Sequence, residues 1–200
     1  VDRVDAGTVM TGAVVDFTAK LDVRGLVWGR DYYYRFSALG RTSMVGRARC
    51  APTGGEAKAL RFAVTSCASL AHGHFHVYRR IAEREDLDAV LHLGDYLYEY
   101  GTGEYGSVRE YEPAHEIVTL ADYRTRHAQY RRDPDLQALH QQHALIPIWD
   151  DHESANDSYE DGAENHQPGT DGAWSDRKQA AKQAYFEWMP IRDPGMQRIY

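Results

Sequence analysis

Hydrophobic and polar residues alternate in the first part of the chain. Between residues 13 and 23 the odd positions are apolar and the even positions are mostly polar, a period of two that predicts a strand with one buried face. A second alternating run covers residues 32–38, and a third, shorter strand is expected at 43–49. Glycine turns rather than helices separate these strands, so residues 1–52 are predicted to form part of an all-β domain, about half of an immunoglobulin- or fibronectin-like sandwich.

The pattern changes after a segment with linker composition, Ala-Pro-Thr-Gly-Gly-Glu, at residues 51–56. Beyond it, short apolar runs typical of buried strands alternate with segments of helical spacing. The strands are expected at 60–65, 89–93 and 145–149, and the helices at 75–82, 119–130, 134–143 and 175–188. This order predicts that residues 59–200 are α/β, with a sheet covered by helices.

Two helix starts carry capping signals. Thr119 and Asp122 match the capping-box pattern, and Asp133 with Pro134 offers an N-cap followed by proline at the first helical position. The polar, glycine-containing stretch at 101–115 is too long for a tight connection, so we expect it to fold over a site.

Composition excludes several classes of protein. Hydrophobic content of 42% and charged content of 26% describe a soluble globular chain. A net charge of −7 and the lack of a Lys/Arg-rich block argue against a nucleic-acid partner. No apolar run approaches the ~20 residues of a membrane span. The chain starts at Val1 with no signal-like segment, and Cys50 and Cys67 do not make a disulfide framework, so targeting and redox compartment stay open.

Three predicted strands end in ligand-type residues: Thr65-Ser-Cys67, Gly94-Asp-Tyr-Leu-Tyr98 and Trp149-Asp-Asp-His-Glu153. In open α/β sheets the carboxyl ends of neighbouring strands form the site. A thiolate, carboxylates and a phenolate gathered there would need cations to neutralise them. Because a free tyrosine has a pKa of about 10, a phenolate ligand requires a strong Lewis acid such as ferric iron, which calcium or magnesium alone cannot replace.

Structural roles compete with ligand roles at several of these positions. Cys67 could be an inert cysteine or could pair with Cys50. Asp150 and Asp151 compete for one ligand place, and Asp151 is preferred because it adjoins His152. His152 itself could cap a loop.

Other candidates are expected to be structural. The histidines at 72, 74 and 76 are expected on the surface, and His140 and His143, on an apolar helix stripe, at the edge of the core. Asn156, Asp157 and His166 are as compatible with bracing a loop as with holding calcium.

The Gly-Asp-x-x-Tyr pattern, followed by a strand that ends in Asp-His-Glu, resembles the two-metal phosphoesterases of the calcineurin-like and purple-acid-phosphatase group. Further motifs narrow the resemblance to the PhoD-type alkaline phosphatase/phosphodiesterase family, and in order they cover nearly the whole chain. These are Ser66-Cys67, His92-Leu-Gly-Asp-Tyr-Leu-Tyr-Glu-Tyr100, Tyr123-Arg-Thr-Arg126, Tyr130-Arg-Arg-Asp-Pro-Asp-Leu-Gln137, Trp149-Asp-Asp-His-Glu153 and Ala184-Tyr-Phe-Glu-Trp-Met-Pro-Ile-Arg192.

The resemblance implies a set of roles. Asp95 would bridge two metals, Cys67 and Tyr98 would hold ferric iron, Asp151 would hold the second metal, calcium, and His152 would contact phosphate or assist the leaving group. A hydroxide held between the metals would attack the phosphorus of a phosphate ester in line. The resemblance also implies an immunoglobulin-like domain ahead of a metallophosphoesterase α/β sandwich, and export to the periplasm, cell surface or medium.

One departure keeps a second hypothesis open. Proteins of this family continue further and supply more Asp and His ligands, whereas the chain ends at Tyr200 and is expected to begin partway through its first domain. Residues 1–200 alone are therefore expected to bind metal weakly and to aggregate. The alternative function is a non-catalytic exported binding module whose β-rich part recognises a surface polymer. Turnover with bound iron would favour the enzyme, and polymer binding without turnover the module.

Overall fold

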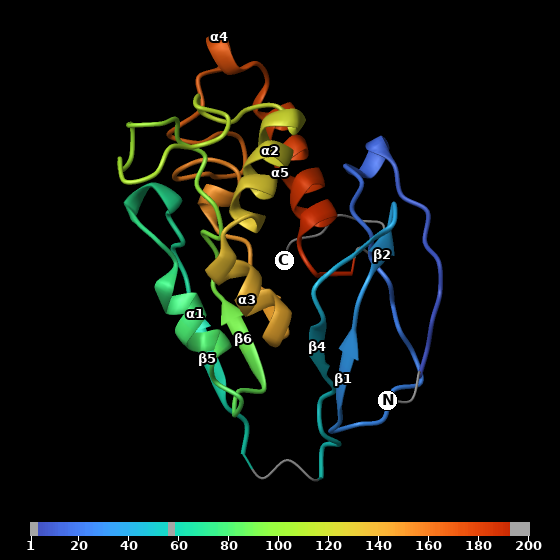
Figure 1. Cartoon of the computed structure of the whole chain (residues 1–200). Helices are drawn as coiled ribbons and strands as arrows, with labels where there is room; N and C mark the ends of the chain where they lie inside the picture. Colours follow the sequence, from blue (N-terminus) through green and yellow to red (C-terminus); the bar gives the residue numbers. More distant parts are fainter. Residues whose placement is uncertain (1–3, 56–58, 193–200) are drawn as a thin grey trace.

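A computed structural model describes residues 4–55 and 59–192 (Figure 1). In the first range β1 (Asp31–Tyr34) pairs antiparallel with β4 (Gly46–Arg49), and β2 (Ser37–Ala38) pairs antiparallel with β3 (Arg41–Thr42). These pairs form two separate two-stranded sheets. The immunoglobulin-like domain therefore stays a prediction, and the predicted linker ends at Glu56, outside the described residues.

The strand predicted at residues 13–23 is wrong. The segment contains a short 3-10 helix, η1 (Ala13–Val15), followed by two residues with left-handed backbone, Asp16 (φ 52°) and Phe17 (φ 56°). All of the odd, apolar positions from 13 to 23 are exposed. Alternation alone does not make a strand, because a strand also needs a partner for its backbone groups, and no described segment pairs with this one.

Polar contacts instead hold this segment against the C-terminal helix α5 (Trp174–Trp188). Trp188 Nε1 donates to Asp16 Oδ2 at 3.0 Å, and Lys20 Nζ donates to the carbonyls of Phe186 and Ile191. Figure 1 shows the blue N-terminal chain passing beside the red helix. The apolar residues of this segment are therefore exposed and are not part of the core that the other described residues form.

The second range carries a parallel sheet in the order β5-β6-β7. Its strands are β5 (Phe62–Thr65), β6 (Ala89–His92) and β7 (Leu145–Pro147). The helices are η2 (Leu70–His72), α1 (His76–Ala82), α2 (Leu120–Arg131), α3 (Pro134–Gln142), η3 (Asp151–Glu153) and α4 (Pro168–Asp171), followed by α5. The predicted α/β order is confirmed for this part of the chain.

The capping residues act as the sequence predicts. Thr119 Oγ1 accepts from the Asp122 N–H at 3.3 Å, while Asp122 Oδ2 accepts from the Thr119 N–H at 2.9 Å, which completes a capping box at the start of α2. Asp133 Oδ1 accepts from the N–H groups of Asp135 and Leu136 at the start of α3. These bonds satisfy N–H groups that a helix leaves unpaired at its start.

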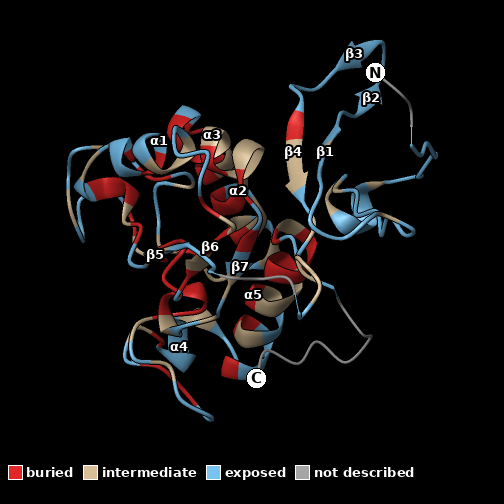
Figure 2. Ribbon diagram, turned by 90° about the horizontal axis from the view of Figure 1, so that it is seen from below, coloured by how far each residue is buried: buried red, intermediate tan, exposed pale blue. Residues whose placement is uncertain are grey.

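One face of the sheet is packed against the helices. Val90 on β6 and Leu145 on β7 lie in the core with side chains from α1, α2, α3 and α5. The opposite face is apolar and is not covered by the described residues, with Val64 at 59% and Ile146 at 51% exposure. Figure 2 shows the buried residues gathered around the helices of this second part, while β1 is largely exposed and β4 is buried or intermediate over most of its length. No helix among the described residues combines the length and apolar character needed to span a bilayer.

Gly94 lets the ends of β6 and β7 approach each other. Its φ is +96°, and an added Cβ would lie 2.3 Å from Asp150 Cβ and 2.9 Å from the Asp150 backbone nitrogen. Such contacts are far inside van der Waals separation. Glycine at this position is therefore required by space as well as by backbone conformation.

The loop after β6 is fixed by a fully buried guanidinium, that of Arg126 on α2. It donates to four carbonyl oxygens, those of Tyr98, Tyr100, Glu112 and Pro113. Its Cζ also lies 4.1 Å from the centre of the Tyr111 ring. One side chain thus ties the residues that follow the central strand to the long loop at 101–118.

Gly94→Ala should destabilise the protein more than Gly103→Ala. Both glycines have positive φ, 96° and 84°, but nothing lies within 4 Å of a Cβ at Gly103. Left-handed backbone costs an L-residue about 1–2 kcal/mol, and overpacking adds about 1–3 kcal/mol at Gly94. Urea unfolding of the two variants measures the difference. Equal losses of unfolding free energy in the two variants would show that the close approach of Gly94 to Asp150 does not require glycine.

Arg126→Met should lower the free energy of unfolding by on the order of 3 kcal/mol, because it leaves buried carbonyls without donors. Arg132→Met is the matched control at the C-terminal end of α2, since the Arg132 side chain is 61% exposed and its ion pair among the described residues is with the half-exposed Glu112. A surface pair of this kind contributes less than about 1 kcal/mol. Similar losses in the two variants would contradict the clamping role.

Candidate metal centre

The three strand ends singled out in the sequence meet at one edge of the sheet, because β5, β6 and β7 are parallel neighbours. Pairing continues past the strands: the Cys67 N–H donates to Gly94 O at 3.2 Å, and the Ala68 N–H donates to Asp95 O at 2.8 Å. Cys67 and Asp95 therefore lie side by side. Both have left-handed backbone, with φ of 58° and 54°, a conformation that costs non-glycine residues energy and is concentrated at functional sites.

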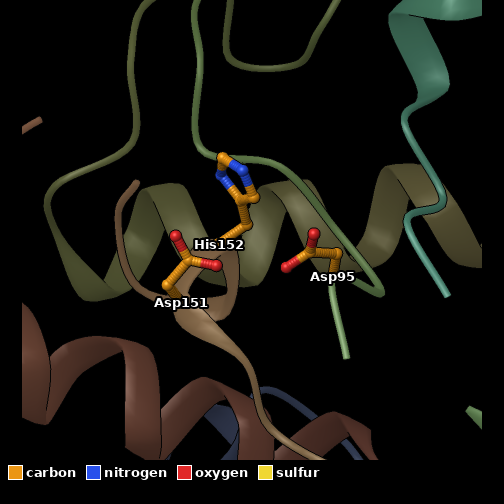
Figure 3. Close-up of side chains that lie close together, drawn as sticks. All are labelled: Asp95, Asp151 and His152. Carbon is orange, nitrogen blue, oxygen red and sulfur yellow. The ribbon is translucent and has the colours of Figure 1, made fainter. Parts of the chain in front are cut away.

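Asp95, Asp151 and His152 form the centre of the site (Figure 3). Each offers a ligand atom, and these atoms all lie within 4.8 Å of one another. Asp95 is 8% exposed, and its Oδ1 is buried with no hydrogen-bond partner among the described residues. An unpartnered carboxylate oxygen costs free energy when buried, so Oδ1 is a free ligand position in the centre.

The other oxygen of Asp95 contacts two predicted iron ligands. Tyr98 Oη donates to Asp95 Oδ2 at 3.1 Å, and Cys67 Sγ lies 3.4 Å from the same oxygen. Burial raises the pKa of Tyr98, and the nearby charges of Asp95 and Cys67 raise it further. Only a strongly charged cation would therefore hold Tyr98 as a phenolate. Cys67 is exposed and lies outside the group of three.

Asp150 and Asp151 have different surroundings. Asp150 caps η3, where its Oδ1 accepts from the Asp151 N–H at 3.1 Å. Asp151 faces Asp95 and His152, and its Oδ2 accepts from the Asp157 N–H at 2.6 Å. Of the two competing carboxylates, Asp151 is therefore the one positioned to bind a cation with Asp95.

His152 is held by a buried carboxylate. Its Nδ1 lies 2.7 Å from Glu99 Oε2, and its ring centre lies 4.2 Å from that of Tyr98. Burial lowers the pKa of His152, but the hydrogen bond and charge of Glu99, with the charges of Asp95 and Asp151, outweigh burial and raise it. The charged imidazolium is therefore favoured beside these carboxylates.

Glu153 binds the backbone of the neighbouring strand end. Its oxygens accept from the N–H groups of Asp95 at 3.1 Å, Tyr96 at 2.6 Å and Asp150 at 2.7 Å. Burial raises its pKa to about 8, and the three N–H donors oppose that shift. Glu153 therefore fixes the main chain that carries Asp95 and is not available as a ligand.

The surrounding loops brace the centre. Tyr105, from the polar stretch at 101–115, stacks on Tyr98 with ring centres 5.7 Å apart, so this loop lies beside the candidate centre. Asn156 Nδ2 donates to Glu164 Oε2, and His166 Nε2 lies 3.1 Å from Gly172 O. Both side chains thus brace the loop that follows η3.

The histidines set aside in the sequence have structural partners. His140 Nε2 lies 2.9 Å from Tyr96 Oη, and His143 Nε2 lies 3.0 Å from Ile81 O. His76 pairs with Asp135, and its side chain is 79% exposed. The prediction that His140 and His143 lie at the edge of the core is confirmed.

Sequence reasoning missed the roles of Glu99 and Glu153. Both lie inside the quoted motifs, and both are almost fully buried at 0% and 1% exposure. Each glutamate directly follows a predicted site residue, Tyr98 or His152, and this position is the signal that could have pointed to a role at the site. The groups that each one binds lie on a neighbouring strand end, and the sequence alone does not show which strands are neighbours.

The donor set fits a metal ion. Asp95 and Asp151 supply carboxylate oxygens beside His152, and Tyr98 and Cys67 contact Oδ2 of Asp95. The buried, unpartnered Oδ1 of Asp95 is satisfied best by a cation. The arrangement is able to hold metal next to a histidine in a position to transfer a proton.

Known proteins are similar to this chain in sequence and in fold. A family model described as "PhoD-like phosphatase" matches residues 62–200, and one described as "PhoD-like phosphatase, N-terminal domain" matches residues 1–52. Alkaline phosphatase D of Bacillus subtilis (strain 168) is 41% identical over 191 residues, which are 93% of this chain and 32% of that protein. A solved structure described as "Structure of PhoD" superimposes with a TM-score of 0.86 at 40% identity, covering 93% of this chain and 36% of the other.

The chain spans about a third of the length of these relatives. Within that span the match runs through both the β-rich part and the strand ends that carry the candidate metal centre. By sequence and by fold, this chain is a member of the PhoD-like phosphatase family.

Proposed function

We propose that the chain provides part of the active centre of a metal-dependent phosphoric ester hydrolase, an alkaline phosphatase or phosphodiesterase. The observation that carries the proposal is the convergence of Asp95, Asp151 and His152, whose ligand atoms lie within 4.8 Å of one another. Family membership supports the same reaction class. The presence of Asp95, Asp151 and His152 together also favours an enzyme over a non-catalytic binding module.

The proposed metals are ferric iron and calcium. Cys67, Tyr98 and Asp95 would hold the iron, because thiolate and phenolate suit a strongly polarising ion. Asp151, with the free oxygen of Asp95, would hold the calcium, which prefers carboxylate oxygens. When bound, the metals would supply an activated water for in-line attack at phosphorus and positive charge against the phosphoryl oxygens.

The side chains of the chain itself have separate tasks. Glu153 fixes the main chain at Asp95 by accepting from the N–H groups of Asp95 and Tyr96, and the side chain of Asp95 accepts from Tyr98 Oη. His152 would contact the phosphate or donate a proton to the leaving oxygen, because the imidazolium is favoured in these surroundings. The substrate would be a phosphate ester, either a small molecule or a cell-surface polymer.

We also propose that the protein is exported from the cell, as its resemblance to the family implies. Cell fractionation of a producing strain, with immunodetection of the full-length protein, tests this. Recovery in the cytoplasm alone would contradict it.

Asp95→Asn and His152→Ala should separate metal binding from turnover in the full-length protein. Loss of the Asp95 charge should remove metal and activity together. His152→Ala should keep its metal and lose turnover by about 10²–10⁴-fold, the usual contribution of general acid–base help. Metal analysis by mass spectrometry and an assay with a chromogenic phosphate ester provide the two measurements.

Asp135→Asn is the matched control, because Asp135 is also buried, at 4%, but pairs with Arg79 and His76 away from the site. It should reduce stability and leave the metal content unchanged. Equal metal loss in Asp95→Asn and His152→Ala would mean that His152 is itself a ligand. Full activity of metal-depleted protein would overturn the proposed function.

Tyr98→Phe should remove a visible absorption band from the iron-loaded protein. A tyrosinate bound to ferric iron absorbs by charge transfer, so the full-length protein should be violet to blue. Tyr100→Phe is the control, since the Tyr100 ring lies near His152, with ring centres 5.6 Å apart, and no hydrogen bond joins it to Asp95 among the described residues. Colourless iron-loaded wild type would contradict the assignment of Tyr98 to iron.

A further inference from the structure

Glu99 is a fully buried carboxylate that is not part of the group of three that converges on the metal position. Both of its oxygens are used. Oε2 lies 2.7 Å from His152 Nδ1, while Oε1 accepts from the Asn156 N–H at 2.6 Å and from Asn165 Nδ2 at 3.1 Å. We propose that Glu99 is the positioning residue for His152: it fixes the proton on Nδ1 and the plane of the ring, and so leaves Nε2 to face substrate.

The pattern of donors fixes the proton on Nδ1. The backbone N–H of Asn156 can only donate, so Oε1 must accept. A charged carboxylate offers acceptors alone, so its second oxygen also requires a donor from His152. Nδ1 therefore carries a hydrogen, and Nε2 is the ring nitrogen left for the reaction. In metal and hydrolase sites a carboxylate behind an imidazole commonly sets the tautomer in this way.

The backbone around Glu99 is held on both sides. The buried guanidinium of Arg126 donates to the carbonyl of Tyr98 and, at 3.0 Å, to that of Tyr100. Rotation of the Glu99 peptide would break these bonds. The main chain at Glu99 is therefore fixed. Its carboxylate is held in one orientation by its own hydrogen bonds, and it holds the His152 ring in one orientation in turn.

The partners of Glu99 are also fixed. Tyr123 Oη donates to Ser154 O, and Arg177 donates from Nη1 to Asn165 O and from Nη2 to Glu116 Oε1 at 2.7 Å. Two buried side chains from α2 and α5 thus hold the loop that presents Asn156 and Asn165 to Glu99. The position of His152 is connected through this loop to the helical core.

The inference rests on the proposed function, in which His152 acts on the substrate. A different reading would make Glu99 a brace for the loop at 154–166 alone, since two of its three bonds go there. The two readings differ in one respect. A positioning residue acts only while His152 is present, whereas a brace acts regardless of the residue at 152.

Glu99→Gln separates them. The amide keeps the size of the side chain but carries one acceptor and one donor, so it cannot satisfy donors from both Asn156 and His152. In the metal-loaded full-length protein we expect kcat to fall about 10–100-fold, the usual effect of losing such a partner. We expect KM to change less than about 3-fold and the metal content to stay at the wild-type level, because no ligand has been removed.

The decisive measurement is the double variant Glu99→Gln/His152→Ala. If Glu99 acts through His152, the double variant should turn over within about 2-fold of His152→Ala alone. Glu187→Gln is the matched control, since Glu187 is 9% exposed and pairs with Arg124, away from His152. It should leave kcat unchanged.

Two results would overturn the inference while leaving the proposed function intact. They are wild-type kcat in Glu99→Gln, and a loss in Glu99→Gln that is equally large in the His152→Ala background. Full turnover in His152→Ala would overturn the role of His152 and, with it, that of Glu99. Loss of metal in Glu99→Gln would assign the carboxylate to ligand geometry instead.

Discussion

The concentration of negative charge at one sheet edge is the constraint on which the rest of the site depends. Parallel pairing of β5, β6 and β7 forces three strand ends together, and the sequence places a thiol, carboxylates and a phenol on them. Buried carboxylates repel one another and cost free energy unless cations or donors compensate them. Asp95 shows both solutions, because its Oδ2 accepts from Tyr98 while its buried Oδ1 is left for a cation.

Two further carboxylates, Glu99 and Glu153, connect the ends of β6 and β7, each from one strand end to the other. Glu153, which follows β7, accepts from the backbone N–H groups of Asp95 and Tyr96 after β6. Glu99, which follows β6, accepts from His152 and from the Asn156 N–H after β7. Each strand end is therefore held by a side chain of the other. A displacement of either loop would break hydrogen bonds on both, which makes the arrangement rigid.

Sequence reasoning predicted the features that depend on local chemistry. The order of strands and helices after residue 59 and the capping box at Thr119 follow from periodicity and from residues three positions apart. Sequence reasoning failed at residues 13–23. Apolar and polar residues alternate there as in a strand, but no described segment pairs with this one. Glu99 and Glu153 were missed for a related reason. Their partners on the neighbouring strand end lie more than 50 residues away, and only the sheet order brings them together.

The reciprocal bonds explain how this chain can hold ligand atoms of like charge near one another. The left-handed backbone at Cys67 and Asp95 is strained by on the order of 1–3 kcal/mol per residue, and it places both side chains on the same side of the sheet edge. Backbone donors to Glu153 and the clamp of Arg126 on the carbonyls beside Glu99 offset that strain with bonds that do not involve the ligand side chains. The geometry is therefore set by the fold, and a bound cation would add the compensating charge that no described side chain supplies to Asp95 Oδ1.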